Sequence, residues 1–239
     1  MMPVPITVGV LTHNAYAFQR FELLEQTLRS IVVAFPDARV CVLDNGSTDG
    51  TAEYVVGVHG AGSLLAGRRA IYTKAYVAED GVHTPGRGHN QLMAMMRGRG
   101  EPGVLVVSED DMLWRLGAAD ILRRFWAEAP EDLVICSGLL EPDFPWSTPR
   151  EVVEAGGVRV LVRDATPHAA WTMRARHVDI VHPVSDGFGQ DHEACVRLLR
   201  DGYRVAQVDL AEHMGWGVSC HGNEAIVNAK PLDREKWGL

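Results

Sequence analysis

VLVVSEDDM, residues 104–112, runs from an apolar, sheet-forming segment directly into three acids, Glu109, Asp110 and Asp111. The apolar run is typical of a strand that is buried on both faces of a parallel sheet. Adjacent carboxylates repel one another and resist burial, so a strand that ends in three of them requires an explanation. A divalent cation with oxygen ligands is one explanation, and a solvated turn that caps the next helix is the alternative.

The composition is that of an ordinary globular protein, with 46% hydrophobic and 23% charged residues in a chain of 239. The length fits one domain, 1–239, or two small ones. A formal charge of −8 argues against a general polyanion binder, so bound phosphate would need a metal ion or a few local donors. Four widely spaced cysteines favour a reduced, cytoplasmic protein. No apolar run approaches the roughly 20 residues that span a bilayer, and the N-terminus lacks a secretory signal pattern.

Strand and helix patterns alternate in the first half of the chain. We expect strands at 6–12, 38–44, 70–77 and 104–108. Apolar residues recur at helical spacing over 21–35. Ser47 or Thr48 can cap a second helix, and a third follows Gly86 and Gly88. Such alternation predicts βαβ units and an open parallel sheet.

The second half of the chain predicts a more mixed set of elements. They are a helix at 117–128, strands at 133–137, 158–163 and 169–174, a helix at 190–201 that Gly202 ends, and a strand at 203–209. The final 30 residues show no periodicity and are expected to form loop. We therefore predict one α/β domain with an open, mostly parallel, Rossmann-like sheet and flanking helices.

Polar residues follow three of the expected strands. Thr12, His13 and Asn14 follow the first, Asp44 and Asn45 follow the second, and the acidic cluster follows the fourth. Ligands of open α/β sheets bind beyond the carboxyl ends of the strands. Each group alone is more typical of a turn, but parallel neighbours would bring all three to one edge.

Five segments, in this order, resemble the GT-A fold nucleotide-sugar glycosyltransferases, in particular the large inverting glycosyltransferase family two. They are VGVLTHN (8–14), VCVLDNGSTDGT (40–51), GRGHNQLMAMMRG (86–98), VVSEDDM (106–112) and GFGQDHEACVRLLRDGYRV (187–205). VVSEDDM occupies the place of that family's Asp-x-Asp (DXD) metal motif. The resemblance covers most of the chain and implies a nucleotide-sugar-binding half, 1–112, and an acceptor-binding half with a C-terminal loop, 113–239.

The resemblance also implies which residues hold the nucleoside-diphosphate sugar. Thr12, Asn14 and Asp44 would contact the nucleoside, with Asn45 as the alternative to Asp44. Arg87 would meet the phosphates or the sugar of the donor.

The metal is expected to be Mn²⁺ or Mg²⁺, bridging the diphosphate. Glu109 and Asp111 stand where the two acids of the metal motif do, and Asp111 is the first choice as direct ligand. Asp110 would hold the ribose or the water shell of the metal. His213 is a further candidate ligand, with His221 as second choice, although a lone histidine is more often structural.

The general base is expected in GQDHEAC, residues 189–195. The resemblance points to Asp191, with Glu193 as the alternative, because Gln190 stands where the family usually has Glu. Asp191 could instead only stabilise the helix N-terminus. Trp216, between two glycines, is a candidate for the acceptor or donor site, whereas Trp171 is expected in the core.

These features predict a soluble, metal-dependent glycosyltransferase that moves a hexosyl or related sugar to a hydroxyl acceptor. The acceptor would be a small molecule, a glycan or a modified nucleobase. The Gln-x-x-Arg-Trp signature of processive synthases is missing. The alternatives are a nucleotidyltransferase or phosphate-processing enzyme, and a non-catalytic nucleotide-sugar-binding protein on the same fold.

Overall fold

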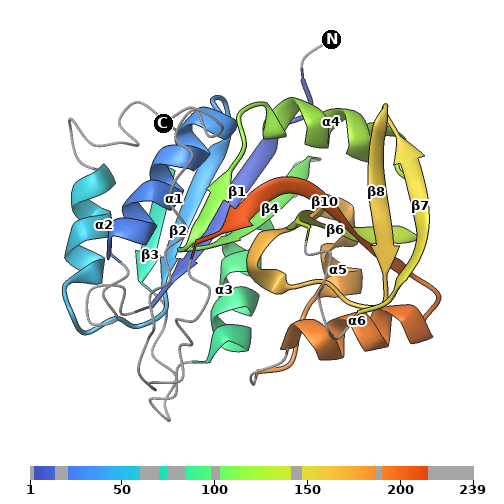
Figure 1. The fold of residues 1–239 in the computed structure, drawn as a ribbon. Helices are drawn as coiled ribbons and strands as arrows, with labels where there is room; N and C mark the ends of the chain where they lie inside the picture. The colour runs from blue at the N-terminus through green and yellow to red at the C-terminus, as the bar shows by residue number, and fades with distance from the viewer. Residues whose placement is uncertain are drawn as a thin grey trace.

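The computed structural model describes residues 3–13, 21–59, 70–74, 84–97, 103–140, 147–186 and 190–214. The strands are β1 (Ile6–Thr12), β2 (Arg39–Asp44), β3 (Ala70–Lys74), β4 (Val104–Glu109), β5 (Met112–Trp114), β6 (Leu133–Leu139), β7 (Pro149–Ala155), β8 (Val158–Arg163), β9 (Trp171–Arg174) and β10 (Arg204–His213). The α-helices are α1 (Phe21–Ala34), α2 (Thr51–His59), α3 (Pro85–Arg97), α4 (Ala118–Glu128), α5 (Val178–Val181) and α6 (Gln190–Arg200) (Figure 1). Two 3₁₀ turns, η1 (His168–Ala170) and η2 (Ala175–His177), flank β9.

The first four strands form the parallel part of one sheet, in the order β3-β2-β1-β4. β1 pairs with both β2 and β4, so that Thr12 lies opposite Asp44 and Leu11 lies opposite Glu109. The predicted α/β fold with parallel βαβ units is confirmed in this half. The register aligns the carboxyl ends of β1, β2 and β4 along one edge.

The C-terminal half continues the same sheet with mixed strand directions, in the order β9-β6-β10-β8-β7. β9 is antiparallel to both β4 and β6, whereas β10 is parallel to β6 and antiparallel to β8. The last residues of β10 also pair with the short strand β5, so His213 lies opposite Met112. The pairing with β5 carries the end of β10 back toward the acidic cluster.

Two apolar cores lie on opposite faces of the sheet (Figure 1). The helices α1, α2 and α4 pack on one face, and α3, α5 and α6 pack on the other. The α3 helix approaches β1 so closely that a Cβ on Gly9 would lie 2.2 Å from Met96 Sδ. A larger residue at Gly9 would therefore force the side chains of Met96 and Leu92 on α3 to shift. None of the helices in the described ranges is long and apolar enough to cross a bilayer.

Some expected boundaries were wrong. The α2 helix begins at Thr51, not after Ser47 or Thr48, because the Asp49 carboxylate accepts from Thr51 N–H (3.1 Å) and so supports the first turn. Gly86 and Gly88 lie inside the first turn of α3 rather than before it. The backbone of Ser185 leaves no room for a side chain at Gly86, since a Cβ there would lie 1.9 Å from that residue's carbonyl oxygen.

Four strands also differ from the prediction. β5 and β7 were not expected, and β10 extends to His213 instead of ending at 209. β7 has mostly exposed side chains and lies at the edge of the sheet, so it lacks the alternation of apolar and polar residues that identifies a half-buried strand. The expected strand at 169–174 begins only at Trp171, after a 3₁₀ turn.

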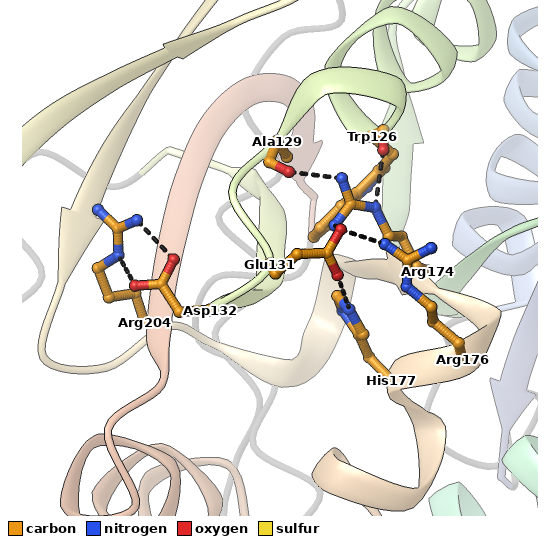
Figure 2. A network of polar contacts seen from close by, with 8 residues as sticks. All are labelled: Trp126, Ala129, Glu131, Asp132, Arg174, Arg176, His177 and Arg204. Carbon is orange, nitrogen blue, oxygen red and sulfur yellow. Dashed lines mark hydrogen bonds and ion pairs between the residues drawn. The ribbon is translucent and has the colours of Figure 1, made fainter.

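The buried Arg174 joins β9 to the end of α4 (Figure 2). Its Nε donates to the carbonyl of Trp126 (2.7 Å), its Nη2 to that of Ala129 (2.5 Å), and its Nη1 to Glu131 (3.3 Å). The last carbonyls of a helix have no partner within the helix, so a fixed guanidinium can satisfy them.

Replacing Arg174 by methionine should lower the free energy of unfolding by about 2–3 kcal/mol, because buried carbonyl oxygens lose a charged donor. Urea unfolding measures this change. Arg176→Met is the control, since Arg176 is mostly exposed and pairs with the exposed Glu131. Equal losses in the two variants would contradict the capping role of Arg174.

Candidate functional site

The polar residues predicted at the strand ends do lie at one edge of the sheet. Thr12 ends β1, Asp44 ends β2 and Glu109 ends β4, and these strands are parallel neighbours. Thr12 and Asp44 are almost fully buried, whereas Glu109 is partly exposed. This edge is where ligands of open α/β sheets bind.

The three residues predicted as metal ligands form a cluster that fits a metal ion. Glu109, Asp111 and His213 each offer one ligand atom, and the three atoms lie within 4.8 Å of one another. His213 Nε2 is 3.3 Å from Asp111 Oδ2. The pairing of β10 with β5 brings them together, and Met214 N–H donates to the carbonyl of Asp111 (2.8 Å).

The donor set suits a divalent cation. Two carboxylates and one imidazole match Mn²⁺ and leave coordination positions for water or phosphate oxygens. Asp111 is only 2% exposed, so its charge is costly without a nearby cation. The residues present therefore fit the expected metal.

Asp110 points to a different partner from its two neighbours. Thr12 Oγ1 donates a 2.7 Å hydrogen bond to Asp110 Oδ2, and both side chains are buried. The three consecutive acids are thus divided between two environments. Glu109 and Asp111 join His213, and Asp110 joins the end of β1.

Asp44 carries a free acceptor at the same edge. Its Oδ1 accepts from Ser47 N–H (2.8 Å), whereas its buried Oδ2 has no hydrogen-bond partner among the described residues. The side chain of the neighbouring Asn45 is used differently, because its Nδ2 donates to the carbonyl of Thr84 (3.2 Å) just before α3. A buried carboxylate oxygen without a donor is uncommon and is a natural contact for a ligand N–H or O–H.

The predicted donor-binding residue Arg87 lies in the first turn of α3. Its Nε is 3.6 Å from Asp186 Oδ2, and its side chain is partly exposed. Thr84 also reaches this segment, since its hydroxyl donates to the carbonyl of Asp186. Arg87 therefore lies where the start of α3 meets the segment that leads into α6.

Asn90 fixes this junction, and its role was not predicted. Its Nδ2 donates to the carbonyl of Val184 (2.9 Å), and its Oδ1 accepts from Val184 N–H (2.9 Å) and His182 Nδ1–H (3.2 Å). Burial, with smaller contributions from the nearby His89 and Arg197, lowers the pKa of His182 to about 3, so His182 stays neutral. A single amide thus holds the segment before α6 against α3.

Replacing Asn90 by aspartate should destabilise this junction by about 1–3 kcal/mol, because a carboxylate cannot donate to the Val184 carbonyl and repels it. Hydrogen exchange of the Val184 amide measures the local opening. Arg97→Ala is the control. Arg97 is another residue of α3 that binds a distant segment, but it does so through an exposed ion pair with Asp179 of α5. Unchanged exchange at Val184 in the aspartate variant would contradict the clamp.

The two candidate bases lie in the first turn of α6. Asp191 is partly exposed, and its Oδ1 accepts from His192 N–H (2.8 Å). Glu193 is exposed and lies further along the helix. Gln190 is buried at the first position. Neither acid belongs to the metal-type cluster, which is formed by other elements.

Other candidates fall outside the site or outside the described residues. Asn14, Trp216 and His221 lie outside the described residues. Trp171 is fully buried and packs in the core, as expected. A cavity of about 380 Å³ lined by Arg174 lies at the amino end of β4, so it is separate from the edge described above.

The sequence matches no protein-family model and no curated protein. Solved structures do match in fold. S. aureus TarS 1-349 superposes with a TM-score of 0.56 at 12% identity, covering 86% of this chain and 58% of that one. The mannosyltransferase PcManGT from Pyrobaculum calidifontis, in complex with GDP-Man and Mn²⁺, gives 0.57 at 15% identity, covering 93% and 59%.

GalNAc-T7 with UDP, GalNAc and Mn²⁺ gives a TM-score of 0.62 at 9% identity, covering 87% of this chain and 43% of that one. The chain therefore spans less than two thirds of the length of each of these proteins. The matching structures are glycosyltransferases, and identities this low establish the fold alone. The chain has the GT-A fold.

Proposed function

We propose that this protein is a metal-dependent glycosyltransferase that moves a sugar from a nucleoside-diphosphate sugar to a hydroxyl acceptor. The observation that carries the proposal is the cluster of Glu109, Asp111 and His213 at the carboxyl edge of a GT-A sheet. Two of the matching structures hold Mn²⁺ together with a nucleotide or nucleotide sugar, which supports the same kind of ligand here.

The two halves of the chain would divide the substrates. Residues 1–112 would hold the donor and residues 113–239 the acceptor. At the donor side, the buried Asp44 Oδ2 has no partner among the described residues and would accept from the nucleoside. Thr12 and Asp110 are hydrogen-bonded to each other beside it and would set the position of the ribose.

A cation held by Glu109, Asp111 and His213 would neutralise the charge that develops on the departing diphosphate. Arg87, in the first turn of α3, would contact the phosphates or the sugar of the donor. On the basis of the sequence resemblance, Asn14 would contact the nucleoside, and Trp216 would contact the acceptor or the donor.

For the transfer step we propose Asp191 as general base. Its carboxylate would take the proton of the acceptor hydroxyl while the oxygen attacks the anomeric carbon opposite the nucleotide, which inverts the configuration. Glu193 is the alternative base. The buried thiols of Cys41, Cys136 and Cys195 fit a protein that works in a reducing compartment such as the cytoplasm.

A thermal-shift panel of nucleoside-diphosphate sugars, with and without Mn²⁺, tests the proposal. A donor present at about 100 times its Kd should add about 2.7 kcal/mol of stability. The stabilising donor is then incubated with small alcohols, glycans and nucleosides with hydroxyl-bearing bases as acceptors.

Release of nucleoside diphosphate together with a glycosylated acceptor would support glycosyl transfer. Release of pyrophosphate would support a nucleotidyltransferase instead, and stable binding without any turnover would support a non-catalytic binding protein. If no nucleotide sugar stabilises the protein with either Mn²⁺ or Mg²⁺, the proposal is wrong.

A further inference from the structure

Two histidine rings are stacked on one another, and one of them approaches Glu109 of the metal-type cluster. His89 from α3 and His168 from η1 have ring centroids 3.6 Å apart with 23° between the ring planes. His168 also lies against Trp171, with ring centroids 3.9 Å apart. His89 and His168 are 0% and 2% exposed, so neither ring reaches solvent.

These two rings are unusual because their nitrogens make no hydrogen bond to any of the residues that the structure describes. All four ring nitrogens are buried without a hydrogen-bond partner among the described residues. Burial, with smaller contributions from His89 and His182, holds the pKa of His168 well below 6.5, so that ring is neutral. Leaving a buried polar group unpaired costs about 1–3 kcal/mol, and natural proteins keep few such groups. Stability of the fold therefore does not explain why these positions carry histidine.

One polar group lies just beyond hydrogen-bond reach of the stack. His89 Nε2 is 3.7 Å from Glu109 Oε1, which is too long for a hydrogen bond. The Glu109 side chain is 35% exposed and has room to turn. A carboxylate that binds a metal through one oxygen is normally held by a donor at the other.

We propose that His89 is a positioning residue for the metal site. Its Nε2–H donates to one oxygen of Glu109 and directs the other oxygen toward a cation shared with Asp111 and His213. Stacking on His168 fixes the plane of the donating ring. The inference rests on the metal site of the proposed function, and it adds a donor that contacts neither the cation nor the substrate.

The test compares Mn²⁺ affinity in variants of the stack, with Mn²⁺ alone as the probe and the free ion followed by electron paramagnetic resonance. His89→Phe keeps an aromatic ring in the stack and removes the N–H. We expect the Kd for Mn²⁺ to rise about 10–100-fold. The melting temperature of the metal-free protein should not fall, because there the apolar ring replaces a ring whose nitrogens have no hydrogen-bond partner among the described residues. His168→Phe is the matched control, and it should leave the Kd unchanged.

A second pair of variants tests the donor nitrogen itself. The amide nitrogen of glutamine reaches the place of Nε2, whereas that of asparagine reaches only the place of Nδ1. His89→Gln should therefore keep most of the affinity, and His89→Asn should lose it as His89→Phe does. If His89→Phe fails to fold, the comparison of the glutamine and asparagine variants still tests whether a donor at the place of Nε2 supports Mn²⁺ binding.

Three results would overturn the inference. They are an unchanged Kd in His89→Phe, an equal loss in His168→Phe, and equal affinities of the glutamine and asparagine variants. Each of these leaves the proposed function standing, provided that the wild type binds Mn²⁺. A wild-type protein that does not bind Mn²⁺, alone or with a nucleotide sugar, would contradict the metal-dependent function and this inference together.

Discussion

Replacing Asp111 by asparagine should weaken Mn²⁺ binding by more than about 100-fold, beyond the 10–100-fold loss typical of an outer partner. Asp111 offers a ligand oxygen to the cluster with Glu109 and His213, and its side chain is almost fully buried. An amide keeps the shape of the side chain but removes one of two negative charges from the site. Binding of a nucleotide sugar should then no longer depend on the metal. Titration of Mn²⁺ by electron paramagnetic resonance measures the first effect, and calorimetry with the donor measures the second.

Asp110→Asn is the control for this experiment. Asp110 is the adjacent acid and equally buried, but it accepts a hydrogen bond from Thr12. Its variant should keep the affinity for Mn²⁺ alone and lose affinity for the donor. If Asp111→Asn retained Mn²⁺-dependent donor binding, Asp111 would not be a ligand. If Asp110→Asn lost Mn²⁺ binding instead, the roles of Asp110 and Asp111 would have to be exchanged.

The grouping of polar residues at one edge of the sheet could be predicted from the sequence, because the patterns that identify the strands are local. Continuous apolar runs identify β1, β2 and β4 as interior strands, and parallel strands have their carboxyl ends at the same edge. Thr12, Asp44 and the acidic cluster are therefore aligned by topology alone. The predicted convergence needed no knowledge of side-chain packing.

The remaining geometry depends on contacts between residues far apart in the chain. His213 reaches Asp111 because three residues of β5 pair with the end of β10, and so short a strand has no detectable period. Asn90 binds Val184, which is 94 residues away, through both its donor and its acceptor. The composition of either segment does not reveal its partner, so the junction of α3 with the segment before α6 and the histidine stack were not predicted.

Replacing Asp191 by asparagine should lower the turnover number by about 10²–10⁴-fold while the Kd for the donor stays the same. Asp191 lies in the first turn of α6, which the segment clamped by Asn90 leads into. It contributes no atom to the metal-type cluster, so its loss should affect proton transfer and not donor binding. Steady-state rates of nucleoside-diphosphate release, together with donor titrations, separate the two effects.

Glu193→Gln is the matched control, because Glu193 is an exposed acid in the same helix and carries the same charge. It should leave turnover near the wild-type rate. A large loss in Glu193→Gln with normal turnover in Asp191→Asn would transfer the role of base to Glu193. Equal, small losses in both would mean that these acids only stabilise the N-terminus of α6. If Asp191→Asn lowered donor affinity as much as turnover, Asp191 would instead be a substrate-binding residue. Loss of a general base lowers the turnover number without weakening donor binding.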